Sequence, residues 1–379
     1  MLAVMPRHLL EDVPAAELAS HPYGSVCPVG NGPFIFAEHR QDASWAFQAN
    51  PAFPEGLGGR PYLDRVVYRV VTETTIRLTE LLTENLDIMI APSPDQAGAI
   101  QDSDALELYR FAGRQTLFVA WNSRRPQLAD KRVRMAITKG TNRAEIVEAL
   151  LGDYGVVANG TVPPFHPLYD ASVGAEVMAY DPDSARALLD AAGWIDRDGD
   201  GVRESAEGVR LSFAIEFNRS QLKQSIAEIM QAQLIDIGIE AIPTLVEWGT
   251  LIQRITDGDS RDFDGVIMAW QTDFRLDDTV LFHSAGVDGS TAWSGTQRPD
   301  LDRYMEGLPL VLDPDSAQSM WNAYLELLVD EQPYTFLYQR DRLVGVNKRL
   351  RGMVMDPRGE WVGVKDWRIA SDQRKRGRL

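Results

Sequence analysis

Strand-like and helix-like segments alternate along the middle of this 379-residue chain, between residues 118 and 270. Residues 209–217 carry apolar side chains at every second position, which is typical of a β-strand. Residues 220–237 follow with the spacing of an amphipathic helix, which Gly238 is expected to end. Strand, helix and strand then repeat as far as residue 270. This alternation predicts an α/β fold for the middle of the chain.

The two ends of the chain are richer in strand-like segments than the middle. We therefore expect one lobe built from both ends and a second lobe inserted between them, with ligands bound where the lobes meet. The predicted first lobe comprises residues 1–114 and 338–370, the inserted lobe residues 115–337, and a basic, disordered tail residues 371–379. Helical spacing predicts helices at residues 72–87, 130–139, 142–151, 181–192 (with Asp181 as N-cap), 300–312 and 315–329.

Charge and composition exclude several classes of protein. The chain carries 38 Lys and Arg against 55 Asp and Glu, a net charge of −17, so it is not expected to bind nucleic acid. Its single cysteine, Cys27, excludes an intrachain disulfide and a multi-cysteine metal site. No stretch approaches the ~18 consecutive apolar residues of a membrane span. The first residues lack the pattern of a signal peptide, because Pro6 and Arg7 interrupt the apolar run.

Catalytic motifs are absent from the sequence or incomplete. The HExxH, P-loop and GxSxG patterns do not occur, and the five histidines are dispersed. Ser220 and Lys223 fit the SxxK pattern of serine acyl-enzymes, but its partner motifs are missing, and a helix N-cap beside a solvated lysine explains the same residues. We therefore expect a protein that is not an enzyme, with a hydrolase on an α/β scaffold as the alternative.

One motif for a metal ion stands out, in the segment DRDGDGVRESAE at residues 196–207. It matches the calcium-loop pattern at every specified position. The expected ligands are the side chains or carbonyl groups of Asp196, Asp198, Asp200, Val202 and Glu207. A strand rather than a helix is expected after the loop, so a bound Ca²⁺ would be structural and the site would not be an EF-hand. The alternative is a surface loop of Asx turns without metal.

Several colinear segments resemble the extracytoplasmic solute-binding proteins of the peptide/nickel ABC transporter class, family 5. The segments that follow the family's order and spacing are PRHLLEDV, PVGNGPF, GGRPYLDRVVYRVV, RLTELLTENLDIM, LFVAWN through LLGDYG, DPDSARALLDAAGW and FDGVIMAWQTDF. The match runs from about residue 6 to residue 369. The resemblance implies a periplasmic-binding-protein-like type II fold, which is a two-lobed clamp whose hinge crossovers fall near residues 114–117 and 335–339.

The chain departs from the family pattern at several places, two of which are Asn142, where an Asp is usual, and Asn85, where a Gly is usual. The segment DFRLDD at residues 273–278 replaces the usual DYPDP-like segment, which leaves the class of ligand open. Family chains also carry a signal peptide and further parts of the lobes before the segment that matches Pro6. We therefore expect a truncated or mis-started chain, whose first lobe is incomplete and has uncovered sheet edges. A paralogue that lost these parts is the alternative.

The resemblance also implies ligand-binding residues. In peptide-binding members, an aspartate after the strand that ends near Trp270 pairs with the α-ammonium group of the ligand, and the matching residue is Asp273. The alternative for Asp273 is a cap of the following helix. Arg219 lies two residues from the position of an arginine that takes the ligand's carboxylate. Trp270 and Phe274 would line the pocket or pack in the core, and Trp248 is expected in the core.

The implied function is that of the substrate-binding component of an ABC importer, which delivers a peptide or related small solute to membrane permease subunits. A periplasmic or extracellular location, with a lipid anchor in the full-length protein as an option, and a monomeric state are implied as well. No cofactor is expected besides the structural Ca²⁺. Peptide length, nickel, an opine or a sugar as ligand stay open, as does a degenerate paralogue that binds no solute.

Overall fold

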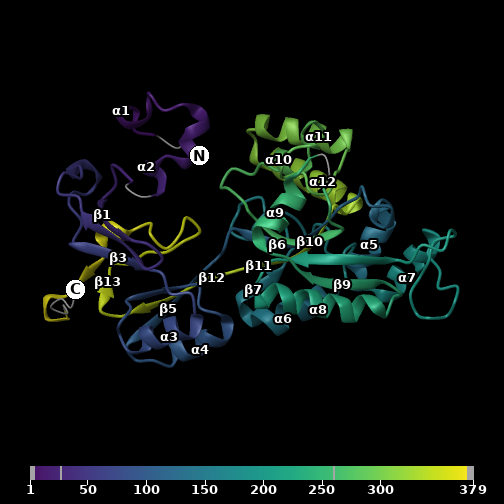
Figure 1. Ribbon diagram of the computed structural model, residues 1–379, viewed down its shortest axis with the longest axis horizontal. Coiled ribbons are helices and arrows are strands. Elements are labelled where there is room, and N and C mark those ends of the chain that lie inside the picture. Colours follow the sequence, from purple (N-terminus) through teal and green to yellow (C-terminus); the bar gives the residue numbers. More distant parts are fainter. Residues whose placement is uncertain (1–4, 26–27, 259–260, 374–379) are drawn as a thin grey trace. The chain divides into compact units, whose positions relative to one another are not determined.

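The computed structural model describes residues 5–25, 28–258 and 261–373, and the chain divides into two units (Figure 1). Unit 1 consists of Met1–Phe111 and Arg342–Leu379, and unit 2 is the continuous segment Ala112–Asp341. Cys27 and residues 374–379 of the predicted tail lie outside the described residues, whereas the first part of that tail forms a short 3₁₀ helix. None of the helices in the described part of the chain combines the length and apolar character of a bilayer span.

Unit 2 is organised around a six-stranded mixed sheet. Its strands are β6 (Gln115–Trp121), β7 (Gly155–Val157), β8 (Ser212–Phe217), β9 (Glu240–Leu245), β10 (Gly265–Gln271) and β11 (Tyr334–Arg340). Their order across the sheet is β7-β11-β6-β10-β8-β9. The strands β8, β9 and β10 run parallel, whereas β6 pairs antiparallel with both β10 and β11. The predicted alternation of strands and helices thus produces the parallel half of this sheet.

Helices cover both faces of the sheet, and each face has its own apolar core (Figure 1). The helices are α5 (Lys131–Gly140), α6 (Arg143–Leu151), α7 (Pro182–Ala191) and α8 (Gln221–Ile235) on one face, and α9 (Trp248–Thr256), α10 (Thr279–Phe282), α11 (Pro299–Gly307) and α12 (Pro314–Glu331) on the other. In β6, Val119 and Trp121 face the first group, whereas Phe118 and Ala120 face the second. Because both faces are buried, residues 117–121 of β6 form a continuous apolar run.

The helices α5–α8 begin where the sequence predicts them. The side chain of Asp181 accepts a hydrogen bond from the backbone N–H of Ser184 at 3.0 Å, as expected of the N-cap of α7. Asn142 and Ser220 cap α6 and α8 in the same way. A cap satisfies a backbone donor that has no partner in the first turn, so these polar residues define the helix starts. The predicted bounds of these four helices agree with the structure within two residues.

A buried arginine ties the start of α5 to the end of α12. Arg134 is 1% exposed, and its guanidinium donates five hydrogen bonds. The acceptors are the backbone carbonyls of Leu128, Ala129, Glu331 and Gln332 and the carboxylate of Glu331. Each N–H group of a buried guanidinium needs such an acceptor. The backbone carbonyls before α5 and at the end of α12 in turn need a donor.

The described residues of unit 1 form two three-stranded antiparallel sheets and one two-stranded sheet, with the orders β1-β2-β3, β4-β12-β5 and β13-β14. The strands are β1 (Phe34–Arg40), β2 (Ser44–Ala49), β3 (Arg65–Arg69), β4 (Ile88–Ile90), β5 (Leu106–Phe111), β12 (Arg342–Asn347), β13 (Leu350–Arg351) and β14 (Arg368–Ile369), and the helices are α1 (Arg7–Leu10), α2 (Pro22–Ser25), α3 (Thr74–Leu82) and α4 (Pro94–Gln101). The helix predicted at residues 72–87 ends early, because Glu84 adopts a φ of 59° that a helix does not allow.

Strand pairing places the unit boundaries a few residues away from those expected. The strand β11 pairs with β6 and β7 as far as Arg340, so residues 338–341 belong to unit 2 rather than to the return into the first lobe. The strand β12 begins directly afterwards, at Arg342, opposite Phe111 at the end of β5. The two connections between the units therefore lie next to these two residues, whereas the expected crossovers fall largely within β6 and β11.

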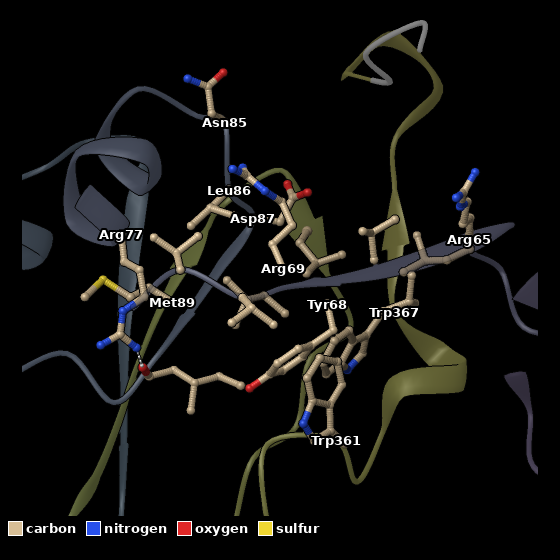
Figure 2. Close-up of a pocket in the computed structure, with 18 of the residues that line it drawn as sticks. Arg65, Tyr68, Arg69, Arg77, Asn85, Leu86, Asp87, Met89, Trp361 and Trp367 are labelled. Carbon is tan, nitrogen blue, oxygen red and sulfur yellow. Dashed lines mark hydrogen bonds between the residues drawn. The ribbon is translucent and has the colours of Figure 1, made fainter. Parts of the chain in front are cut away.

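A cavity of about 440 Å³ lies within unit 1 between β3 and β4 (Figure 2). Its lining combines the aromatic side chains of Tyr68, Trp361 and Trp367 with the cationic ones of Arg69 and Arg77. Both strands lie at sheet edges, and in the described part of the chain each pairs on one side only. The free backbone groups of such an edge can pair with a further strand.

Candidate functional site

Three of the residues implied as ligand contacts, Trp270, Asp273 and Phe274, lie at the carboxyl end of β10, in unit 2. The strand ends at Gln271, and the next residue, Thr272, is anchored on both sides. Its N–H donates to the carbonyl of Arg114 at 2.9 Å, and its hydroxyl donates to the carbonyl of Thr161 at 3.1 Å. Because Thr272 is only 4% exposed, water does not compete for these bonds. The anchor holds the following residue, Asp273, close to the start of β6.

Asp273 presents its carboxylate to solvent, with 54% of the side chain exposed. Its Oδ1 lies 3.5 Å from Nη1 of Arg114 and accepts the N–H of Phe274 at 3.1 Å. The guanidinium carbon of Arg114 also lies 4.9 Å from the centroid of the Phe274 ring, as in a cation–π contact. The helix α10 has Asp278 as its N-cap residue, so Asp273 does not play the capping role that was its alternative.

Aromatic side chains occur on both sides of Asp273 in the sequence. Phe274 is 42% exposed, and its ring lies 5.8 Å from the ring of Phe165. Trp270 is partly buried and packs edge-on against Trp293, with 6.2 Å between the ring centroids. Phe274 is therefore open to a ligand, whereas much of Trp270 packs against the core beneath α9–α12.

Arg219 and Trp248 follow β8 and β9, which are neighbouring strands of the same sheet. Arg219 is exposed and follows the carboxyl end of β8, the strand parallel to β10, so Arg219 and Asp273 emerge at the same sheet edge. Trp248 is 50% exposed at the first position of α9, and the expectation that it belongs to the core is wrong. The helix instead turns Leu251 and Ile255 into the core, and Trp248 lies outside that face.

Arg114 is the site residue that sequence reasoning missed. It reaches Asp273 because β6 and β10 pair antiparallel, with Gln115 opposite Gln271. No local pattern connects residues so far apart in the chain. The available signal was a basic residue placed directly before a buried strand, at the edge where ligands are expected.

A buried carboxyl group lies behind the same segment. Asp278 is 4% exposed, and its Oδ2 accepts hydrogen bonds from the hydroxyls of Thr161 at 2.6 Å and Tyr324 at 3.1 Å. Burial raises the pKa of Asp278 to about 6, and the two hydroxyl donors oppose this rise only in part. Since the backbone of Thr161 also anchors Thr272, Asp278 supports the segment that carries Asp273.

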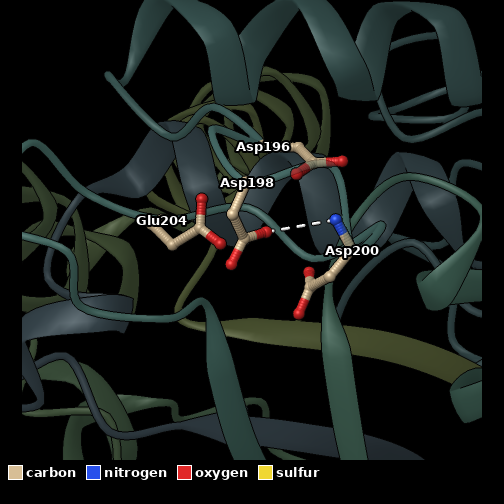
Figure 3. Close-up of side chains that lie close together, drawn as sticks. All are labelled: Asp196, Asp198, Asp200 and Glu204. Atoms are coloured by element: carbon tan, nitrogen blue, oxygen red, sulfur yellow. Dashed lines mark hydrogen bonds between the residues drawn. The ribbon is translucent and has the colours of Figure 1, made fainter.

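The second group of candidate residues lies on the loop between α7 and β8 (Figure 3). The side chains of Asp196, Asp198 and Asp200 come together there with that of Glu204. One carboxylate oxygen from each residue lies within 4.8 Å of the others. The three aspartates are exposed, whereas Glu204 is buried. Three of the predicted metal ligands are therefore neighbours in space.

Glu207, the predicted fourth carboxylate, is not a member of this group. Its Oε2 accepts the hydroxyl of Ser205 at 2.9 Å. The reason is that the loop closes early, because the backbones of Ile195 and Glu204 exchange two hydrogen bonds of 3.1 and 3.0 Å. This pairing brings the ninth position of the motif to the aspartates in place of the twelfth. Val202 buries its side chain, and its N–H donates to Asp200.

Solved structures of solute-binding proteins have the same fold. The structure of the oligopeptide-binding protein AppA from Bacillus subtilis in complex with a nonapeptide matches with a TM-score of 0.85 at 27% identity, covering 97% of this chain and 72% of that chain. Lactococcal OppA complexed with an endogenous peptide matches with a TM-score of 0.86 at 21% identity, covering 97% and 70%. These matches confirm the α/β, periplasmic-binding-protein-like fold class.

A model of the bacterial extracellular solute-binding proteins, family 5 middle region, matches residues 6–291, and the chain belongs to this family. AppA of Bacillus subtilis (strain 168) is 27% identical over 369 residues, which are 97% of this chain and 67% of AppA. The dipeptide-binding protein of Escherichia coli (strain K12) is 24% identical over 336 residues, 88% of this chain and 60% of that protein. The chain thus spans about two thirds or less of the length of these relatives.

Proposed function

We propose that this chain is the substrate-binding component of an ABC importer, which binds peptides and passes them to membrane permease subunits. The observation that carries the proposal is the similarity to an oligopeptide-binding protein over 97% of the chain. Membership of an extracellular solute-binding family supports action in the periplasm or outside the cell. In this proposal the protein is a monomer and does no chemistry on its ligand.

The geometry at Asp273 supports a role in binding the ligand's α-ammonium group. The carboxylate is exposed at the carboxyl end of β10, beside the exposed ring of Phe274. The contact with Arg114 measures 3.5 Å, which is longer than the about 2.7–2.9 Å of a strong charge-assisted hydrogen bond. An ammonium group that reaches Asp273 would form the shorter bond, while Arg114 stays oriented by its contact with Phe274.

Defined peptides of two to nine residues test the function. Those that bind are expected to raise the melting temperature of the protein, because a ligand of the native state stabilises it by mass action. Mass spectrometry of the same mixtures is expected to recover the peptides intact. Cleaved peptides would favour the hydrolase alternative, and a series in which no peptide raises the melting temperature would favour the degenerate paralogue.

Asp273→Asn is expected to weaken binding of a free-amine peptide roughly 10- to 100-fold, because a charge-assisted hydrogen bond contributes about 1.5–3 kcal/mol. Binding of the N-acetylated form of the same peptide is expected to change by less than about threefold, since it carries no ammonium group. Isothermal titration calorimetry at pH 7 measures both dissociation constants.

Asp315→Asn provides the matched control for this experiment. Asp315 is an exposed aspartate in the first turn of α12, and its replacement removes one negative charge from unit 2 without touching the segment after β10. The control is expected to bind both peptides like the unsubstituted protein. An equal loss of affinity for the free and the acetylated peptide in Asp273→Asn would contradict the ammonium role.

A further inference from the structure

We propose that the loop between α7 and β8 binds one Ca²⁺ ion through the side chains of Asp196, Asp198, Asp200 and Glu204. The four residues place one carboxylate oxygen each within 4.8 Å of the others. Hard oxygen donors clustered in this way are the environment that Ca²⁺ takes in proteins. The site lies outside the segment proposed for peptide binding, so the calcium proposal does not depend on that function.

The loop backbone presents the aspartates to one side before any ion binds. Gly199 and Gly201 have φ angles of 80° and 92°, which glycine adopts without strain, and the chain reverses at these positions. Asp196 accepts the N–H groups of Gly199 at 2.8 Å and Gly201 at 3.1 Å. Figure 3 shows the third bond of this kind, in which Asp198 accepts the N–H of Asp200 at 3.1 Å. These bonds fix the turn of the loop, in which one carboxylate oxygen of each aspartate lies within 4.8 Å of the others.

Glu204 supplies the independent observation that points to an ion. The residue is 6% exposed, and Figure 3 shows its carboxylate directed at that of Asp198. Its Oε2 accepts the N–H of Arg197 at 3.0 Å, but its Oε1 is buried and meets no hydrogen-bond donor among the described residues. A buried carboxylate oxygen without a partner is unfavourable, and a cation between Glu204 and Asp198 removes that cost.

The electrostatics of the loop favour a divalent ion. Four carboxylates at this separation repel one another, and the ion pair between Arg210 and Asp200 offsets one of the four charges. The excess of negative charge that is left matches a doubly charged cation. Ca²⁺ suits an irregular set of protein oxygens better than Mg²⁺ does, because Mg²⁺ demands near-octahedral geometry and keeps several of its waters.

The test uses the full chain, stripped with EDTA and desalted. Isothermal titration with CaCl₂ is expected to show one site per chain. Ca²⁺ at about one hundred times its dissociation constant is expected to raise the melting temperature by roughly 5–10 °C over EDTA, and Mg²⁺ at the same concentration by much less. Equal melting temperatures in Ca²⁺ and EDTA would overturn the proposal, and an equal response to Mg²⁺ would overturn the assignment of Ca²⁺.

Glu204→Gln and Glu207→Gln form a matched pair within one loop. Glu204→Gln is expected to weaken Ca²⁺ binding at least tenfold, while its melting temperature in EDTA equals or exceeds that of the unsubstituted protein, because the unpartnered buried charge is gone. Glu207→Gln is expected to bind Ca²⁺ normally, since Glu207 bonds to Ser205. Asp198→Asn, at an exposed position, repeats the loss without a core change. A Glu204→Gln variant that is destabilised equally in Ca²⁺ and EDTA would refute the metal role.

Discussion

Replacing Arg134 by methionine is expected to lower the free energy of unfolding of unit 2 by about 3–5 kcal/mol. Methionine fills much of the same space but donates no hydrogen bond. Four backbone carbonyls and the carboxylate of Glu331 then lose the donor that they share, in a site where the arginine is 1% exposed. The penalty comes chiefly from leaving the backbone carbonyls buried without this donor, because the carboxylate of Glu331 keeps its ion pair with Arg298 at 3.3 Å.

Urea unfolding followed by tryptophan fluorescence measures this effect. Arg134→Lys is expected to recover little of the loss, because a single ammonium group does not reach acceptors that a planar guanidinium bridges. Arg303→Met is the matched control, since Arg303 is an exposed arginine of α11, and its cost is expected to stay below about 0.5 kcal/mol. An Arg134→Met variant within 1 kcal/mol of the unsubstituted protein would show that water satisfies these acceptors.

Asp278→Asn is expected to abolish a decrease in the free energy of unfolding that the unsubstituted protein shows as the pH rises to about 6. Burial raises the folded-state pKa of Asp278 from 3.8 to about 6, so the folded protein holds this proton more tightly than the unfolded chain. The stability contributed by the protonated group is fully present below pH 3.8 and is lost as the pH rises through 6. A rise of this size corresponds to about 3 kcal/mol. The asparagine variant carries no proton to lose and is expected to lack this decline.

Unfolding free energies at pH 4, 5, 6 and 7 give the comparison, and the difference between the two proteins isolates the single group from all other titrations. Asp315→Asn is expected to keep the full decline, because its carboxylate is exposed. If Asp278→Asn retained the same decline as the unsubstituted protein, the proton uptake would belong to another residue, and the buried hydrogen bonds to Thr161 and Tyr324 would hold the carboxylate ionised.

The parts of the fold that were predictable from sequence are those with a local cause. The helix α7 begins after Asp181, whose short polar side chain accepts a hydrogen bond from a backbone N–H of the first turn. The helix α8 has apolar residues on one face and polar residues on the other. The family resemblance rests on several such segments in one order. Each of these signals is contained within a few consecutive residues, so no knowledge of long-range contacts was needed.

The parts that were not predictable depend on pairing between distant residues. Arg114 meets Asp273 only because β6 and β10 pair in one particular register. Glu204 replaces Glu207 beside the aspartates because its backbone pairs with that of Ile195, whereas the motif spacing assumes a helix after the loop. In both cases the sequence shows which residue types are present. It does not show the backbone pairing that decides which of these residues come into contact.

The two connections between the units have a consequence for the order in which the chain folds. Unit 2 is continuous, and its first and last strands, β6 and β11, pair directly, with Thr116 opposite Gln339. Unit 1 needs Phe111 and Arg342 side by side to pair β5 with β12. With unit 2 unfolded, this pairing must close a loop of well over two hundred residues, an entropic cost of about 5 kcal/mol. Once unit 2 has folded, its own sheet has closed that loop, so we expect the inserted segment to fold first and to act as the template on which the discontinuous unit assembles.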